Sequence, residues 1–162
     1  WSSDVCSSDL NPGKTYEAKR VAFRFIKEAL WMQLPSGRLI CWRDPEIEKQ
    51  LTPWGTMKDG ITVRNQSTFT RKWGRNNLIG SSIFQSAVQG AARDMLAESS
   101  LLLELNGFEV LNLIHDEVLL QVNEDDGETA LDRVVQLMTT PPKWASDFPL
   151  AAEGWYGKRY RK

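Results

Sequence analysis

The sequence predicts an α+β protein, in which a small antiparallel sheet is covered on one side by helices. Apolar runs flank turn residues at 30–42 and at 111–122, as the strands of β-hairpins do. Between these two hairpins, residues 81–105 carry apolar side chains at the spacing of one long helix. Strands and helices that do not alternate along the chain are typical of the α+β class.

The length and composition indicate one globular core. The chain has 162 residues, of which 41% are hydrophobic and 25% charged, too few for two large domains. A net charge of −1 excludes a uniformly basic nucleic-acid-binding protein, so any contact with DNA has to come from local patches. Cys6 and Cys41 form neither a metal-ligand spacing nor a disulfide framework, which fits a reducing compartment. No run approaches the roughly 20 apolar residues of a membrane helix, so no membrane association is expected.

Residues 1–10 differ from the rest of the chain. They repeat Ser-Ser-Asp, contain no Met and lack the basic, apolar and small regions of a signal peptide. They resemble translated adapter sequence, and we expect them to be a non-native segment. The native protein would then extend upstream of Asn11.

Basic and apolar residues alternate in residues 16–30, with Phe23, Ile26 and Leu30 at helical spacing. This pattern predicts a basic amphipathic helix, whose basic face is either a solvated surface or a binding surface. The following residues 30–42 predict a hairpin around a Pro-Ser-Gly turn.

The second strand of this hairpin is expected to end at Asp44-Pro45-Glu46. Residues 53–60 are expected to form a loop, and residues 61–66 a further strand. A basic loop is expected at residues 68–80, where Arg71, Lys72 and Arg75 surround a tryptophan and a glycine. Arg and Lys side chains contact phosphate oxygens, and Gly lets the main chain approach them. An exposed loop without a ligand is the alternative.

The long helix predicted at residues 81–105 carries a polar ridge. Gln85, Gln89 and Arg93 recur every four residues, which places them on one face. Such a ridge can donate to base edges in a DNA minor groove and to phosphate, so we expect it to face solvent, with Val88 and Met95 buried. Asn106-Gly107 is expected to cap the helix. The apolar stripe is assigned to Phe84, Val88, Ala91, Met95, Leu102 and Leu105.

The tripeptide His115-Asp116-Glu117 lies between the apolar runs 111–114 and 118–122. Three polar residues between strand-like runs are typical of a hairpin tip, which exposes both carboxylates on a rigid support. Hard oxygen ligands of this kind suit Mg²⁺, which takes one or two carboxylates and fills its other positions with water and substrate phosphate. The alternative is an ordinary solvated turn.

Charge is divided along the chain around this tripeptide. No Lys or Arg occurs between Asp94 and Asp132, and no carboxylate occurs between Gly60 and Arg93. This division predicts an acidic metal-binding edge beside a basic phosphate-binding edge.

After the second hairpin, residues 123–127 predict an acidic turn and residues 128–138 a helix, stopped by Pro141-Pro142. Both predicted helices are expected to cover the sheet. Residues 149–153 predict a last short strand, and the basic ending 157–162 a solvated tail, with phosphate contact as the alternative.

The chain resembles the C-terminal part of family A DNA polymerases, and above all phage replicative enzymes of the DNA polymerase I type. The resemblance covers residues 11–162 and implies that they are the palm and adjoining elements of a polymerase domain truncated at its N-terminus. It rests on five segments in the order of the family: Leu34-Pro35-Ser36-Gly37-Arg38, Thr70-Arg71-Lys72-Trp73-Gly74-Arg75, Gln89-Gly90-Ala91-Ala92-Arg93-Asp94, Ile114-His115-Asp116-Glu117-Val118 and Leu150-Ala151-Ala152-Glu153-Gly154-Trp155.

This resemblance implies roles for the tripeptide and the ridge. Asp116 is similar to the motif C aspartate that holds the catalytic Mg²⁺ ions, Glu117 to its acidic neighbour with a lesser role, and His115 to the residue that touches the primer end. Gln89 matches the glutamine that contacts the minor groove near the primer terminus. The sequence departs from the bacterial enzymes at two positions, where Gln85 replaces an asparagine and Ser81 an arginine.

The implied activity is that of a DNA-directed DNA polymerase. Such an enzyme adds nucleotides from deoxynucleoside triphosphates to the 3′ end of primer–template DNA with two Mg²⁺ ions, and we expect it as a monomer in the cytoplasm of a bacterial host. The family's other metal-binding aspartate, in an Asp-Tyr-Ser-x-Ile-Glu motif, and its fingers helix do not occur in this sequence. Because two metal ions need carboxylates from both palm strands, we expect this chain to be inactive alone.

Two alternatives remain open. A nonenzymatic DNA-binding remnant would keep the basic loop and the glutamine helix without the chemistry. A metal-dependent hydrolase would use His115 as a base, although His115 is the only histidine and no second one is available to bind the metal.

Overall fold

The computed structural model describes residues 14–51, 54–67 and 70–160. The chain divides into two compact units, residues 1–90 and residues 91–162, each described by itself below. Within the described residues the fold is α+β, with a six-stranded antiparallel sheet, a two-stranded hairpin and two α-helices, which confirms the predicted class. No helix in these residues is both long and apolar enough to cross a membrane.

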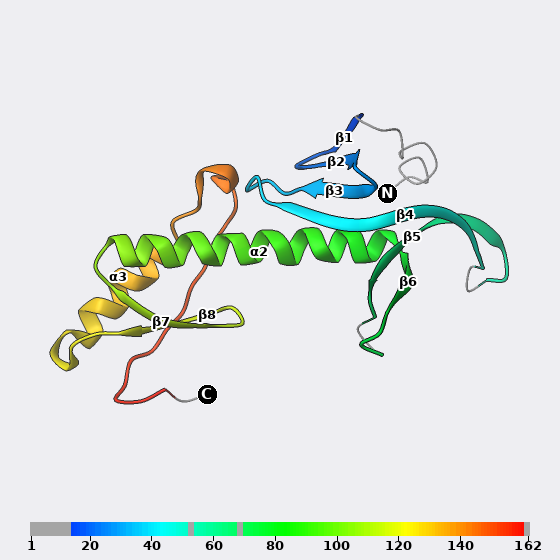
Figure 1. The fold of residues 1–162 in the computed structure, drawn as a ribbon. Coiled ribbons are helices and arrows are strands. Elements are labelled where there is room, and N and C mark those ends of the chain that lie inside the picture. Colours follow the sequence, from blue (N-terminus) through cyan, green and yellow to red (C-terminus); the bar gives the residue numbers. More distant parts are fainter. Residues whose placement is uncertain (1–13, 52–53, 68–69, 161–162) are drawn as a thin grey trace. The chain divides into compact units, whose positions relative to one another are not determined.

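The first unit contains a meander, in which each strand pairs with the next one along the chain (Figure 1). The long β4–β5 pair extends well beyond the shorter N-terminal strands. The strands are β1 (Thr15–Ala18), β2 (Val21–Ile26), β3 (Ala29–Gln33), β4 (Leu39–Leu51), β5 (Met57–Gln66) and β6 (Trp73–Leu78).

The predicted helix at residues 16–30 is wrong, because this stretch forms β1, β2 and the start of β3. Phe23 is buried and its neighbour Arg24 exposed, which is the two-residue period of a strand. The turn between β2 and β3 consists of Lys27 and Glu28, both at positive φ, as in a type I′ turn. Asn and Gly usually mark such a turn in a sequence, and neither is present here.

The predicted hairpin at residues 30–42 is confirmed as β3–β4, and Gly37 in its turn has a φ of +90°. The predicted end of the strand at Asp44 is wrong, since β4 continues to Leu51. A register shift between Arg43 and Glu46 accommodates Pro45, as bulges do for a residue that cannot donate to the ladder.

The predicted loops around β5 are shorter in the structure. The loop expected at residues 53–60 ends at Met57, where β5 begins, and β5 contains the predicted strand 61–66. Residue 53 lies outside the described residues, as do residues 68–69 of the expected basic loop. The prediction of a loop is also wrong for Trp73–Leu78, because these residues form β6. Gly74, Asn76 and Asn77 have low strand propensity, and pairing with β5 overrides it.

The core of the first unit lies on one face of the sheet. Ile83, from the first turns of α2 (Gly80–Leu105), packs into it, and Ala87 lies against it. Gly90 is buried further along α2: a Cβ there would lie 2.7 Å from Leu34 Cδ1, so the helix approaches the sheet more closely than alanine would allow. The buried residues are Phe23, Leu30, Met32, Leu34, Trp42, Ile61, Val63, Leu78 and Ile83.

The second unit contains the end of α2 and the elements that follow it. The predicted helix and its cap are confirmed: Phe108 N donates to Leu103 O at 3.1 Å and Gly107 N to Glu104 O at 3.0 Å, with Gly107 at a φ of +85°. These two bonds define a Schellman motif. The following elements are β7 (Glu109–Ile114), β8 (Glu117–Gln121), a 3₁₀ turn (Glu124–Asp126), α3 (Gly127–Met138) and a second 3₁₀ turn (Lys143–Ala145).

The helix predicted at residues 128–138 is confirmed by α3, and the acidic turn before it by the first 3₁₀ turn. The strand predicted at residues 149–153 is wrong, since these residues belong to no sheet. A run of Leu and Ala satisfies strand propensity, but a strand also needs a partner to accept its hydrogen bonds.

Candidate functional site

The predicted hairpin tip is confirmed and is one residue tighter than expected. His115 and Asp116 form the two-residue turn between β7 and β8, and Glu117 is already the first residue of β8, paired with Ile114. All three side chains are exposed. The rigid ladder on both sides therefore fixes the backbone from which Asp116 and Glu117 project.

His115 has a φ of +57°, and Asp116 is not at positive φ. A positive φ at the first turn residue alone fits a type II′ turn, where glycine is usual. A histidine in this place costs about 1 kcal/mol or more in backbone strain, which the paired strands compensate. Leu111 is an extra, unpaired residue between Val110 and Asn112, and a bulge of this kind changes where the following side chains point.

The Glu117 carboxylate is held by the end of the chain. The Tyr160 hydroxyl donates to Glu117 Oε2 at 2.9 Å. This hydrogen bond raises the pKa of Tyr160, and partial desolvation and the negative charge of Glu117 act in the same direction. The contact joins the hairpin tip to a residue 43 positions away in the sequence.

The tip carries two exposed carboxylates whose chemistry suits a metal ion. Asp116 forms no ion pair with any other described residue, and its exposed carboxylate is a hard oxygen donor of the kind that Mg²⁺ prefers. Among the described residues, no group of three or more His, Cys, Asp or Glu side chains is placed to hold a metal ion. Asp116 and Glu117 therefore do not make up a metal site by themselves, and their binding of Mg²⁺ stays a prediction.

The polar ridge on α2 is exposed at Gln85, Gln89 and Arg93, as predicted. Burial of Val88 is wrong, because 51% of that residue is exposed, and Met95 is only half-buried. The predicted apolar stripe is displaced by one residue from the face that packs on the sheet. The residues that pack on the sheet are spaced at i, i+4 and i+7, namely Ile83, Ala87 and Gly90.

The basic residues near β6 have different surroundings. Arg71 and Lys72 are exposed in the turn before β6, next to Trp73, which is 70% exposed. The three residues offer two cations and one accessible aromatic face.

Arg75 lies further into β6 and is engaged by protein groups. Its Nη2 lies 2.7 Å from both Asp44 Oδ2 and Glu46 Oε1, and its Nη1 donates to Asp44 O at 2.9 Å and Thr62 Oγ1 at 3.2 Å. Arg64 also pairs with Asp44 at 3.1 Å. Arg75 thus ties β6 to the irregular part of β4, and its predicted contact with phosphate stays a prediction.

The structure brings together only some of the predicted residues. His115, Asp116 and Glu117 meet at one tip in the second unit, whereas Arg71, Lys72 and Gln89 belong to the first.

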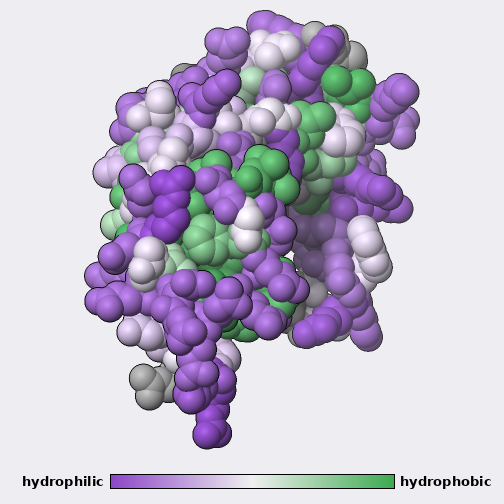
Figure 2. Space-filling view, turned by 90° about the vertical axis from the view of Figure 1, so that its left-hand side faces the viewer, coloured by the Kyte–Doolittle hydropathy of each residue, from purple (hydrophilic) through white to green (hydrophobic). Residues whose placement is uncertain are grey.

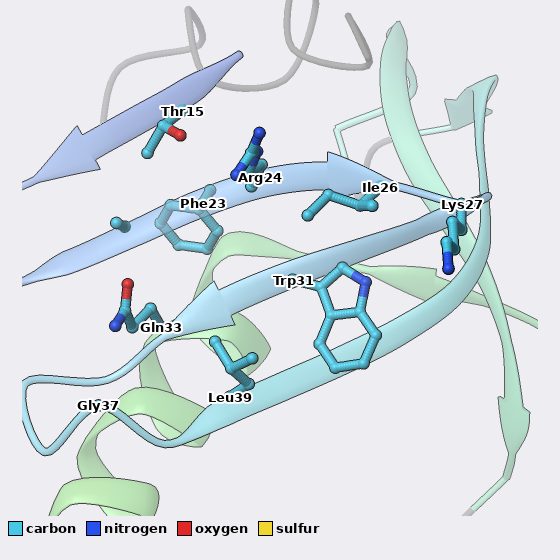
Figure 3. A pocket seen from close by; sticks show the side chains of 10 residues that line it. Thr15, Phe23, Arg24, Ile26, Lys27, Trp31, Gln33, Gly37 and Leu39 are labelled. Carbon is cyan, nitrogen blue, oxygen red and sulfur yellow. The ribbon is translucent and has the colours of Figure 1, made fainter. Parts of the chain in front are cut away.

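The first sheet carries a pocket of about 530 Å³ (Figure 3). This pocket was not predicted from the sequence. Trp31 from β3 lies in it with Arg24 from β2 and Lys27 from the turn between these strands. Assigning residues 16–30 to a helix hid this grouping. The alternation in β2 is the signal that would have placed Ala22, Arg24 and Ile26 on one face.

The second unit exposes several large apolar side chains. Figure 2 shows a face on which hydrophobic residues gather among hydrophilic ones. Exposed apolar patches of appreciable size are typical of contact surfaces. The exposed residues include Leu101, Leu105, Leu111, Phe148, Trp155 and Tyr156.

Comparison with known proteins identifies a relative among the DNA polymerases. The chain is 32% identical over 149 residues to the DNA polymerase of Bacillus phage SP02, an alignment that covers 88% of this chain and 21% of that polymerase. No protein-family model and no solved structure matches the chain. The protein is therefore a distant homologue of part of a phage DNA polymerase, and it spans about a fifth of the length of that relative.

Proposed function

We propose that residues 11–162 form the C-terminal part of the polymerase domain of a phage-type family A DNA polymerase, with the β7–β8 hairpin as motif C of the palm. The observation that carries this proposal is an exposed Asp-Glu pair at a two-residue hairpin tip in a chain homologous to a DNA polymerase. Residues 1–10 would not belong to the native protein. The exposed apolar residues of the second unit fit a unit that packs against further protein.

In this proposal, Asp116 is the ligand of the catalytic Mg²⁺ ions, and Glu117 adds negative charge beside it. Bound Mg²⁺ would activate the primer 3′-hydroxyl for attack on the α-phosphate of a deoxynucleoside triphosphate and neutralise the leaving pyrophosphate. His115 touches the primer end. The turn holds both carboxylates on a fixed backbone, so little ordering is needed when the substrate arrives.

Primer–template DNA is the proposed macromolecular partner. Gln89 and Gln85 would donate to base edges in the minor groove, and Arg93 would contact phosphate from the next turn of the same exposed ridge. Arg71 and Lys72 would hold the backbone of the DNA, with Arg75 as a further candidate. These phosphate contacts position the duplex and carry no sequence information.

The 162-residue chain alone is expected to be inactive. Asp116 and Glu117 lie on one tip, and a two-metal site needs a carboxylate from a second strand. The proposed enzyme is a monomer that acts in the cytoplasm of a bacterial host, and an upstream segment supplies motif A and the fingers helix.

The test is single-nucleotide extension with Mg²⁺ by the polymerase that contains this chain, alongside a gel-shift measurement of primer–template affinity. Asp116→Ala is expected to abolish extension and leave DNA affinity largely intact, because the metal acts on the transition state while many other contacts hold the DNA. Glu117→Ala is expected to cost much less.

Near-normal extension by the Asp116→Ala protein would show that the motif C assignment is wrong. Reading the gene upstream of Asn11 tests the same proposal independently. An in-frame motif A supports the polymerase, whereas a stop codon directly upstream favours the nonenzymatic DNA-binding remnant.

A further inference from the structure

The last described residues form a strap along the second unit, which we define as residues 154–160 and which bends at residues 158–159. Its contacts with the second unit include those of Gly154 with Leu131, Tyr156 with Gly127, Lys158 with Glu124, and Tyr160 with Glu117.

The partners of the strap follow a clear direction. They move back along the chain, from the middle of α3 through its first residue and the 3₁₀ turn to the first residue of β8. The strap therefore runs antiparallel to α3 and ends at the hairpin tip. Its final side chain arrives at the carboxylate next to Asp116.

The aromatic ring of Tyr156 contacts α3 before the strap reaches the tip. A Cβ on Gly127 would lie 2.6 Å from Tyr156 Cδ2, so the ring covers a position that glycine leaves open. At Gly154 the nearest atom to a Cβ would be Leu131 Cδ1 at 2.7 Å, the end of a side chain that can move aside. The pair of Lys158 Nζ and Glu124 Oε1, 2.7 Å apart, is largely exposed and adds little. The contact of Tyr156 with α3 therefore guides the strap toward the tip, where Tyr160 forms its hydrogen bond.

We propose that Tyr160 is a positioning residue, which holds the Glu117 carboxylate in one orientation beside Asp116 through its 2.9 Å hydrogen bond. This inference rests on the proposed polymerase function. A glutamate has three rotatable side-chain bonds, and a hydrogen bond from a fixed phenol removes much of that freedom. The raised pKa of Tyr160 agrees with a phenol that donates to a carboxylate.

The expected consequence concerns the metal site. When the hydrogen bond from Tyr160 is formed, the Glu117 carboxylate keeps one orientation. Asp116 is then the carboxylate that binds Mg²⁺. When the hydrogen bond is lost, Glu117 samples other rotamers, which lowers the fraction of molecules with the correct site. Tyr160 acts through Glu117, so its effect cannot exceed that of removing Glu117.

The experiment is a double-mutant cycle in the polymerase that contains this chain, with the variants Tyr160→Phe, Glu117→Ala and both together. Tyr160→Phe is expected to raise the Mg²⁺ concentration for half-maximal extension by about threefold. In the Glu117→Ala background the same substitution is expected to change nothing. Tyr156→Phe, on the same strap, is the matched control and is expected to match the unsubstituted protein.

NMR of the tyrosine ring carbons in the 162-residue chain tests the hydrogen bond itself, and it requires neither metal nor enzymatic activity. Glu117→Gln is expected to shift the Tyr160 signal and leave the Tyr156 signal in place. An unmoved Tyr160 signal, or equal effects of Tyr160→Phe with and without Glu117, would overturn the positioning role. In those cases an inactive Asp116→Ala protein would still support the proposed function, so the two failures are distinguishable. An active Asp116→Ala protein would overturn both.

Discussion

The ionisation of Tyr160 gives a direct measure of the contact at the hairpin tip. Loss of the proton removes the hydrogen bond to Glu117 and places two negative charges together, so the pKa lies above its ordinary value of 10.0. The stabilisation from this contact is present below pH 10 and is lost as the pH rises through the raised pKa.

Titration of tyrosinate absorbance near alkaline pH checks this expectation in a chain that carries Tyr16→Phe and Tyr156→Phe, because the sequence has three tyrosines. Glu117→Gln is expected to lower the pKa of Tyr160 toward 10.0. An unchanged titration curve would mean that the hydrogen bond is not formed in solution.

At Arg75, a role in stability can be distinguished from a role in DNA binding by substitution. Arg75→Ala removes the partner of Asp44 and Glu46, both about half-exposed, and is expected to lower the free energy of unfolding by about 1 kcal/mol after allowance for solvent screening. Arg75→Lys is not expected to restore it, because an ammonium cannot reproduce the forked geometry. Urea denaturation measures both variants.

Lys72→Ala is the matched control for Arg75. This lysine is exposed and lies in the same basic stretch, so its loss is expected to leave the free energy of unfolding unchanged and to weaken DNA binding. If Arg75→Ala weakened DNA binding without a loss of stability, the structural role of Arg75 would be refuted.

At the scale of elements, the contact between α2 and the first sheet depends on Gly90. A Cβ at this position would lie 2.7 Å from Leu34 Cδ1 and 3.2 Å from Arg38 Nη2, in a buried place. Overpacking by Gly90→Ala is expected to cost about 1–3 kcal/mol, and the better helix propensity of alanine restores about 1 kcal/mol. The net loss in the free energy of unfolding is therefore expected to be up to about 2 kcal/mol.

Gly80→Ala is the control for Gly90→Ala, because nothing lies within 4 Å of a Cβ at the start of the same helix. It is expected to be neutral or stabilising, and thermal unfolding measures both variants. A stabilising Gly90→Ala would show that α2 does not pack so closely on the sheet.

The elements that could be predicted have local signals. The helix α2 has a periodic apolar pattern and a glycine at the position that its Schellman motif requires, and the β3–β4 turn has Gly37 at positive φ. The β1–β3 meander has no such signal, since Lys19, Lys27 and Glu28 take the positive φ values in its turns. Apolar residues in so short a stretch satisfy both the helical and the strand period.

At the scale of the whole molecule, the hairpin tip could be predicted from the sequence, whereas its contact with Tyr160 could not. The tip is a local feature, in which polar residues separate two apolar strands. The contact between Tyr160 and Glu117 joins residues 43 positions apart, and only the packing of α3 and the strap brings them together. Likewise, the carboxylates that engage Arg75 come from β4, whose continuation past Pro45 the sequence did not indicate.

The last prediction separates DNA binding from catalysis in the 162-residue chain itself. The exposed Arg71, Lys72 and Arg93 are cations available for phosphate, so the chain is expected to bind primer–template DNA with an affinity that falls steeply with salt. Each substitution of one of these residues by alanine is expected to reduce the slope of log K against log salt by about 1. Fluorescence anisotropy between about 50 and 200 mM salt measures the slope.

Extension is expected to be absent in the same preparation, even with Mg²⁺ and deoxynucleoside triphosphates at saturating concentrations. Asp116 supplies a ligand from one strand only, and the transition state for phosphoryl transfer needs its charge neutralised from both sides of the reacting phosphate. Joining the upstream sequence is expected to add activity and to leave the contributions of Arg71, Lys72 and Arg93 to the salt slope in place. Extension by the 162-residue chain alone would show that its metal site is complete, and an unchanged slope in all three alanine variants would refute the proposed DNA contacts.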